Sequence, residues 1–140
     1  MDRTASARWN GDLKGGKGTL KVGSGAFEGS YSFTSRFEGG GGTNPEELLG
    51  AAHAGCFSMA LSHALAQAGK VPTSVETTAT VHLGKVAAGF AITGIDLKTR
   101  GVVPGLSADE FRRFAEDTKA NCIVSKALAA VPMTLDAALA

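Results

Sequence analysis

Cys56 and Cys122 are the residues of this chain whose side chains could carry redox chemistry. They lie far apart in the sequence, which excludes a C-x-x-C motif, and spacing alone does not show that the two thiols meet. Cys56 lies in an apolar run that is predicted to be helical. Because a thiol in mid-helix gains little from the helix dipole, Cys56 needs a nearby cation to become a reactive thiolate. Without one, it would be an inert core cysteine, which is the commonest role of a free buried cysteine.

Arg36 and Glu46 carry the charges that could act on Cys56. Glu46 lies roughly three helical turns before Cys56, about 15 Å along the axis, so it cannot touch the thiol directly. It could instead hold an arginine that reaches between them, and Arg36, predicted on the preceding strand, is the candidate. Alternatively, Glu46 is an ordinary acid of the first helical turn and Arg36 is a solvated strand residue.

Two histidines offer further possibilities for the same thiol. His53 and His63 could share a helix face with Cys56, which would allow a thiolate–imidazolium pair. With Cys122 they also provide the ligand types of a zinc site, but their spacing matches no standard metal signature. We therefore expect no metal and no other cofactor, and we expect each histidine to be hydrogen-bonded or partly exposed.

The N-terminal part of the chain, up to about residue 40, is rich in glycine and contains short strand-like runs. Residues 19–22 form one predicted strand. Residues 31–38 form the clearest one, because their three aromatic side chains alternate onto one face. Arg36 would point to the opposite face of that strand. A run of glycines at residues 39–42 follows as a flexible connection.

A long helix is predicted from Pro45 to about Gln67. Asn44 or Thr43 can cap it, proline suits the first helical position, and two glutamates follow in the first turn. Gly69 is its expected stop. Because this helix is apolar nearly all round, we expect it to be buried rather than amphipathic.

The second half of the chain alternates between strand and helix signals. Residues 74–83 alternate as a strand, and a second strand beginning near Phe90 shifts its apolar parity at Gly94, as a β-bulge would. A capping box at residues 107–110 starts a second helix.

Cys122 marks a break after that second helix, followed by a short third helix. Residues 133–139 then form a closing strand. The order of strands, helix, strands, helix and strand predicts an α+β fold. The length of 140 residues predicts one domain, residues 1–140.

Composition excludes several kinds of partner. Fourteen basic residues against thirteen acidic ones give a net charge of +1, and aromatic residues make up 6% of the chain. Neither a nucleic acid nor an anionic membrane is therefore an expected partner. The chain starts with polar residues rather than a signal sequence, and the apolar run contains histidines, serines and glycines. We expect a cytoplasmic protein in which this run does not span a membrane.

The segment from Asn44 to Glu47, followed by Cys56 in the same apolar run, forms a specific pattern with the second cysteine region. The sequence resembles the osmotically inducible protein C (OsmC) family, the relatives of the bacterial organic hydroperoxide resistance proteins, and is closer to the OsmC branch. The resemblance covers essentially the whole chain, through residues 7–14, 16–18, 36–39, 43–62, 86–93, 103–105 and 120–125.

The resemblance implies an OsmC-like α+β fold with antiparallel sheets around a long central buried helix that carries Cys56. It also implies an intertwined homodimer with two active sites where the subunits meet. Carried over to this sequence, Cys56 would be the peroxidatic thiol and Cys122 the resolving thiol. Arg36 and Glu46 would match the pair that holds and activates the thiolate, with Glu47 as the adjacent alternative.

The implied activity is that of a Cys-based peroxidase in oxidative and osmotic stress defence. It would reduce organic hydroperoxides, and hydrogen peroxide less well, through a Cys56 sulfenic acid and a Cys56–Cys122 disulfide. A dithiol reductant, of the lipoyl type in some members, would recycle the disulfide. One position departs from many relatives: Ile123 stands after the second cysteine where they have proline, which could alter the turn at Cys122.

Overall fold

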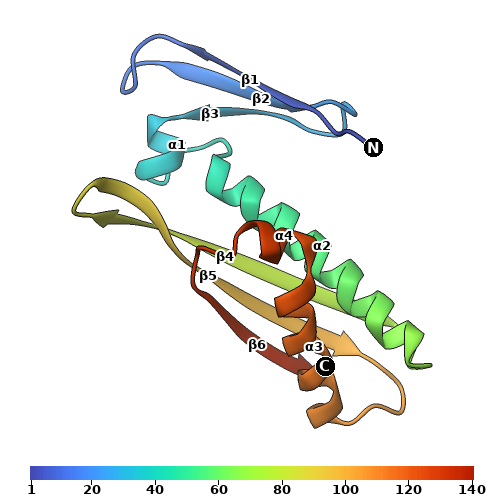
Figure 1. Ribbon diagram of the computed structural model, residues 1–140. Coiled ribbons are helices and arrows are strands. Elements are labelled where there is room, and N and C mark those ends of the chain that lie inside the picture. Colours follow the sequence, from blue (N-terminus) through green and yellow to red (C-terminus); the bar gives the residue numbers. More distant parts are fainter. The chain divides into compact units, whose positions relative to one another are not determined.

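The computed structural model describes residues 1–140, which form two compact units, residues 1–48 and residues 49–140 (Figure 1). The first unit contains a sheet and a short helix. The second contains another sheet with the other helices, and the long helix begins at the end of the first unit. The predicted α+β class is confirmed.

Three antiparallel strands, β1 (Ala5–Asn10), β2 (Lys17–Val22) and β3 (Glu28–Ser32), form the sheet of the first unit in the order β1-β2-β3. The Trp9 and Tyr31 rings pack against each other on this sheet, with centroids 5.2 Å apart. Gly18 lies between them on β2, and a Cβ at this position would overlap the Tyr31 ring. Glycine at this position therefore allows the two aromatic rings to meet.

The predicted strand over residues 31–38 is wrong beyond Ser32, because a short helix, α1 (Phe33–Phe37), begins there. Ser32 caps this helix: its hydroxyl accepts the Ser35 N–H, and the Ser35 hydroxyl accepts the Ser32 N–H. The Ser35 hydroxyl is also within 2.8 Å of the Thr43 carbonyl, to which it donates. These local bonds outweigh the alternating pattern, and they place Arg36 on a helix rather than on a strand.

The long helix, α2 (Pro45–Gln67), begins and ends where the sequence predicts. Asn44 caps it, since its side-chain oxygen accepts the Glu47 N–H at 2.8 Å. Gly69 has a φ of +73°, a left-handed conformation that favours glycine and that ends the helix.

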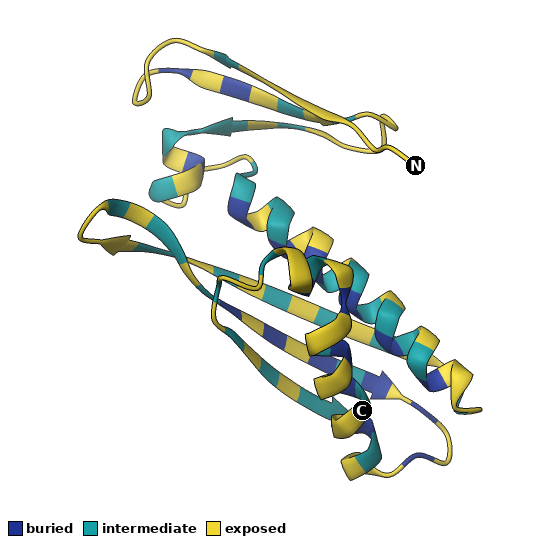
Figure 2. Cartoon of the chain, viewed as in Figure 1, coloured by how far each residue is buried: buried dark blue, intermediate teal, exposed yellow.

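α2 is buried along one face only, so the prediction of a helix buried all round is wrong for the single chain. The buried face carries His53, Phe57, Leu61 and Leu65, whereas Met59 on another face is 77% exposed (Figure 2). The second unit supplies one sheet to cover this helix, which is enough for one of its faces. By length and composition α2 could cross a membrane, as can many core helices of soluble proteins. Its buried apolar residues, Phe57, Leu61 and Leu65, belong to the core.

Strands β4 (Ser74–Val86), β5 (Gly89–Val102) and β6 (Met133–Leu139) form the sheet of the second unit, in that order. The predicted β-bulge is confirmed: His82 lies opposite Gly94 and Leu83 opposite Ile92, which leaves Thr93 as the extra residue of β5. β6 pairs in parallel with β5, so this sheet is mixed rather than wholly antiparallel. The two helices between β5 and β6 provide the crossover that parallel pairing needs.

Helix α3 (Ala108–Asn121) starts at the predicted capping box, in which the Ser107 hydroxyl and the Glu110 side chain bond each other's backbone N–H. Cys122 then separates α3 from the short helix α4 (Ile123–Ala127), as the predicted break requires. α2, α3 and α4 lie on the same face of the second sheet (Figure 1). They enclose a core with β5, and Cys122 belongs to that core.

Candidate functional site

The two thiols lie together in the second unit. The Cys56 and Cys122 sulfur atoms are 3.0 Å apart, within hydrogen-bond distance, and both cysteines are free thiols. Cys56 comes from α2, and Cys122 from the junction of α3 and α4. They differ in access, because Cys56 is half-buried while Cys122 is only 1% exposed. The sequence left open whether the two thiols meet, and this contact answers the question.

The surroundings shift the pKa values of the two thiols in opposite directions. Burial raises the pKa of Cys56, as does the hydrogen bond shared with Cys122, and the backbone N–H groups of Val124 and Ile123 offset this only in part. Burial also acts to raise the pKa of Cys122, but hydrogen bonds from the Ser125 backbone and hydroxyl and the contact shared with Cys56 outweigh it, so that the pKa is lowered.

Ile123 takes part in this arrangement through its backbone. It begins α4, the helical position that proline favours, so the departure from many relatives leaves the turn at Cys122 suited to a helix start. Unlike proline, Ile123 has an N–H, and this group bonds the Cys56 sulfur and acts to lower its pKa.

His53 lies in the core beside the thiols. Its side chain is fully buried, and its Nε2 is 2.7 Å from the Ser125 hydroxyl oxygen. Its Nδ1 is buried without a hydrogen-bond partner. Burial lowers the pKa of His53, which favours the neutral imidazole. Ser125 is itself 4% exposed, and its backbone N–H and hydroxyl act to lower the pKa of Cys122.

Of the four residues considered as zinc ligands, only the two cysteines are in contact. His53 bonds Ser125, and His63 lies on an exposed part of α2. No group of three or more His, Cys, Asp or Glu side chains is placed to hold a metal ion.

Arg36 and Glu46 form an ion pair in the first unit. Arg36 Nη2 donates to Glu46 Oε1 at 2.7 Å, and its Nε lies 3.2 Å from both carboxylate oxygens. The Glu46 side chain is 9% exposed and that of Arg36 is 38% exposed. The partner is therefore Glu46 rather than Glu47, whose carboxylate instead accepts the Thr43 hydroxyl hydrogen at 2.9 Å.

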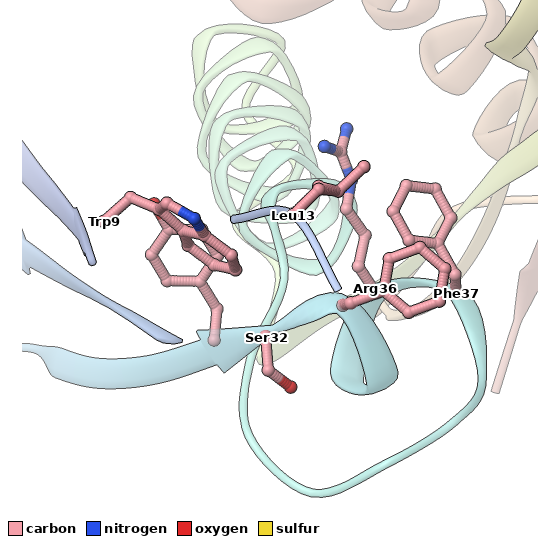
Figure 3. A pocket seen from close by; sticks show the side chains of 7 residues that line it. Trp9, Leu13, Ser32, Arg36 and Phe37 are labelled. Carbon is pink, nitrogen blue, oxygen red and sulfur yellow. The ribbon is translucent and has the colours of Figure 1, made fainter. Parts of the chain in front are cut away.

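A mainly apolar pocket of about 280 Å³ lies beside Arg36 in the first unit (Figure 3). The Arg36 guanidinium carbon lies 5.2 Å from the centre of the Phe37 ring. The pocket is lined by Trp9, Leu13, Tyr31, Ser32, Phe33, Arg36 and Phe37.

The sequence did not predict that Trp9 and Leu13 line a pocket. It also did not predict that Ser125 contacts His53. Trp9 and Leu13 reach the pocket because β1 and β3 both pair with β2, which brings Trp9 of β1 next to Tyr31 of β3 across Gly18; a local pattern does not reveal this pairing. Ser125 is an ordinary serine of a five-residue helix, and only its contact with His53 distinguishes it.

The chain belongs to the OsmC-like protein family, whose model matches residues 38–136. Peroxiredoxin OsmC of Escherichia coli strain K12 is 54% identical to it over 137 residues, which span 97% of this chain and 95% of that relative. An organic hydroperoxide resistance protein of Xanthomonas axonopodis pv. citri is 36% identical over 90 residues, 64% of this chain and 61% of that protein.

Solved structures share the fold. The organic hydroperoxide resistance protein OhrB of Bacillus subtilis superimposes with a TM-score of 0.75 at 25% identity, covering 96% of this chain and 97% of that one. An OsmC protein of Legionella pneumophila superimposes with a TM-score of 0.72 at 24% identity, covering 96% of each chain. The OsmC-like fold is therefore established for this chain by both sequence and structure.

Proposed function

We propose that this protein is a Cys-based peroxidase that reduces organic hydroperoxides, and hydrogen peroxide less well. The observation that carries the proposal is the 3.0 Å contact between the sulfur atoms of Cys56 and Cys122 in a member of the OsmC family. The names of its relatives, a peroxiredoxin and organic hydroperoxide resistance proteins, support the same activity.

In the proposed reaction, the Cys56 thiolate attacks one oxygen of the hydroperoxide R–O–O–H. The O–O bond breaks, Cys56 becomes a sulfenic acid, and the alkoxide takes a proton and leaves as the alcohol. Cys122 then attacks the Cys56 sulfur, forming the disulfide and releasing water. An external dithiol reduces that disulfide by thiol exchange and becomes oxidised in turn.

The difference in access supports the proposed roles of the two cysteines. Cys56 is half-buried and can meet a peroxide, whereas Cys122 is 1% exposed and is shielded from one. Because the thiols are already within hydrogen-bond distance, the second step needs little movement of either sulfur. Fast closure would protect Cys56 from further oxidation.

Arg36 is proposed to favour the Cys56 thiolate and to donate to a peroxide oxygen, with Glu46 holding the guanidinium. The ion pair occupies Nε and Nη2 of Arg36, which leaves Nη1 available for another acceptor. A cation is needed for this role, since burial raises the pKa of Cys56 in its own surroundings. An arginine can supply it, because its charge persists at every physiological pH.

The apolar pocket beside Arg36 supports a preference for organic over inorganic hydroperoxides. Aromatic and aliphatic side chains line most of it, and these would gain from contact with an alkyl or aryl group. Hydrogen peroxide has no such group and would bind less well. We expect this pocket to determine which organic groups are preferred in the hydroperoxide substrate.

We further propose that residues 1–140 act as one domain in an intertwined cytoplasmic homodimer, with no cofactor. The exposed apolar part of α2, including Met59, supports an interface with a second copy. The reductant is proposed to be a small or protein-bound dithiol, with two thiols as in a reduced lipoyl group. Stress defence is the proposed physiological role.

A coupled assay tests the proposal. Consumption of cumene hydroperoxide is followed with dihydrolipoamide as reductant, for the wild-type protein and for the Cys56→Ser and Cys122→Ser variants. Cys56→Ser should lose activity completely, and Cys122→Ser should complete about one turnover per subunit. Full dithiol-dependent activity in Cys56→Ser would exclude the proposed mechanism. Stoichiometric zinc in wild-type protein, lost in Cys56→Ser, would favour a metal-binding protein instead.

A further inference from the structure

We infer that the hydrogen bond between His53 and Ser125 is a clamp that holds the Cys122 thiol against Cys56 until the disulfide closes. Both residues are thus assigned as positioning residues, since neither takes part in the chemistry. The inference rests on the proposed peroxidase function and deepens it, because it names what keeps the two thiols together during the reaction.

Two contacts join α2 to the segment that starts at Cys122 and continues as α4. The Cys56 and Cys122 sulfur atoms are 3.0 Å apart, and His53 Nε2 lies 2.7 Å from the Ser125 hydroxyl oxygen. His53 and Cys56 are three positions apart on α2, so they lie on one face of it, about 4.5 Å apart along the axis. Ser125 is the third residue of α4, and Cys122 directly precedes that helix. Two contacts at this spacing fix α4 along α2 better than one contact could.

α4 depends on such contacts for its position. It has five residues, far fewer than the roughly 12–15 that an isolated helix needs to be stable in water. No side chain caps its start, because Cys122 makes no capping hydrogen bond there. The clamp residues His53 and Ser125 are both buried, where a hydrogen bond is stronger than in water. The clamp is therefore able to determine where α4, and with it Cys122, lies.

The clamp matters most after Cys56 is oxidised. The contact between the sulfur atoms is a hydrogen bond between two reduced thiols, and it is lost in that form when Cys56 becomes a sulfenic acid. The His53–Ser125 bond involves neither sulfur, so oxidation leaves it in place. From 3.0 Å, the sulfur atoms must approach by about 1 Å to form a disulfide bond. While the clamp holds α4, Cys122 needs only this short movement.

A buried polar pair contributes little to stability, which indicates that this one serves position instead. His53 Nδ1 is buried without a hydrogen-bond partner, and such an unpaired atom costs free energy. Apolar side chains in place of both His53 and Ser125 would avoid that cost, and such replacements can be neutral or stabilising. They would lack a bond of defined length and direction. α4 could then pack against α2 in more than one position.

Two measurements on the same variants test the clamp. The first is the rate of disulfide closure after one equivalent of cumene hydroperoxide, followed by acid quench and mass spectrometry at several pH values. The second is the equilibrium with oxidised glutathione, in which two protein thiols and one glutathione disulfide give the protein disulfide and two reduced glutathione molecules. Because this equilibrium needs no peroxide, it tests the clamp separately from the peroxidase function.

The variants break the clamp from either side. His53→Leu replaces the imidazole with an apolar side chain, and Ser125→Ala removes the hydroxyl should His53→Leu fail to fold. His53→Gln can still donate a hydrogen bond to Ser125 and is the conservative variant. Thr99→Val is the matched control, because it removes another buried hydroxyl of the same unit, which lies 3.0 Å from the Thr77 hydroxyl oxygen.

His53→Leu, Ser125→Ala and their double variant should close the disulfide at least about tenfold more slowly than wild type. The glutathione equilibrium constant should fall by a similar factor, because both quantities follow the effective concentration of one thiol at the other. The slower closure should persist at about pH 10, above the ordinary pKa of a thiol. The double variant should be as stable to urea as wild type. His53→Gln should restore closure to within about threefold of wild type.

Thr99→Val should lose stability but close its disulfide at the wild-type rate. Unchanged closure and an unchanged glutathione equilibrium in His53→Leu and Ser125→Ala would overturn the clamp. Slower closure that disappears at high pH would also overturn it, because that result indicates a changed acidity of Cys122. Equally slow closure in Thr99→Val would do so as well, since it indicates a general loss of stability.

The wild-type protein separates the clamp from the proposed function. A wild-type protein that forms the disulfide with glutathione but not with cumene hydroperoxide would refute the peroxidase function and leave the clamp intact. Wild-type thiols that remain reduced in both experiments would overturn the clamp and the peroxidase function together.

Discussion

Cys56 and Cys122 differ in access and in acidity, and the two properties favour different thiols as the first nucleophile. The lowered pKa of Cys122 favours its ionisation, while burial raises the pKa of Cys56. Our proposal makes Cys56 the first nucleophile on the ground of access, because a thiolate that a peroxide cannot reach does not react with it, and Cys122 is 1% exposed. The lowered pKa of Cys122 suits the second step of the proposed reaction, in which its thiolate attacks the Cys56 sulfur.

The Arg36→Ala variant tests whether Arg36 stabilises the Cys56 thiolate. If Arg36 favours the thiolate, its loss should slow sulfenic acid formation at least about tenfold at pH 7, since one unit of pKa changes the thiolate fraction tenfold. It should also destabilise the fold by about 1–3 kcal/mol, because Glu46 is left buried and unpaired. Stopped-flow kinetics and urea unfolding measure the two effects separately.

Arg36→Ala combined with Glu46→Gln is the matched control for that experiment. Removing the unpaired charge should recover much of the lost stability but none of the lost rate. Recovery of the rate along with the stability would contradict a direct role of Arg36 and would leave the ion pair purely structural.

At the residue scale, the sequence predicted the types of group but not all of their contacts. Arg36 was predicted to pair with a glutamate, and only the cap at Asn44 and the Thr43 contact distinguish Glu46 from Glu47. The contact of His53 with Ser125 joins residues 72 positions apart, which no local pattern signals.

Gly101 of β5 sets how closely α3 approaches the second sheet. The Phe111 ring of α3 is fully buried over this glycine, and a Cβ there would overlap the ring. Gly101→Ala should therefore destabilise the protein by about 1–3 kcal/mol, as overpacking of a core does. Urea denaturation followed by circular dichroism measures the change.

Gly94→Ala is the matched control on the same strand. A Cβ at Gly94 would lie 3.7 Å from its nearest neighbour, which is ordinary contact. This variant should change stability much less than Gly101→Ala. Equal losses in the two variants would mean that strand propensity, not the Phe111 contact, determines the effect.

At the element scale, capping signals explain both the correct and the wrong predictions. The box at Ser107 has the glutamate that marks a helix start, so the sequence identified it. The box at Ser32 uses Ser35 in place of an acid, and the aromatic alternation around it resembles a strand. The parallel pairing of β6 depends on where the crossover returns the chain, and a strand pattern carries no such information.

At the scale of the whole molecule, the single chain leaves the apolar side of α2 exposed. Met59 on this helix is 77% exposed, and our proposal places it in the homodimer interface. Met59→Lys should raise the dimer Kd at least about tenfold, because a buried unpaired charge is costly. Light scattering during size-exclusion chromatography over a dilution series measures the Kd.

Val71→Lys provides the comparison, since Val71 is 70% exposed but lies outside the helix. It should leave the dimer intact. A wild-type protein that is monomeric at micromolar concentration, or a Met59→Lys variant that dimerises like wild type, would contradict the proposed interface.

The most direct test of the peroxidase account is mass spectrometry of the wild-type, Cys56→Ser and Cys122→Ser proteins after one equivalent of cumene hydroperoxide. The account predicts an intramolecular Cys56–Cys122 disulfide in wild type within seconds, a sulfenic acid on Cys56 in Cys122→Ser, and no oxidation of Cys122 in Cys56→Ser. A sulfenic acid that forms on Cys122 in Cys56→Ser as fast as on Cys56, or wild-type thiols that remain reduced, would contradict it.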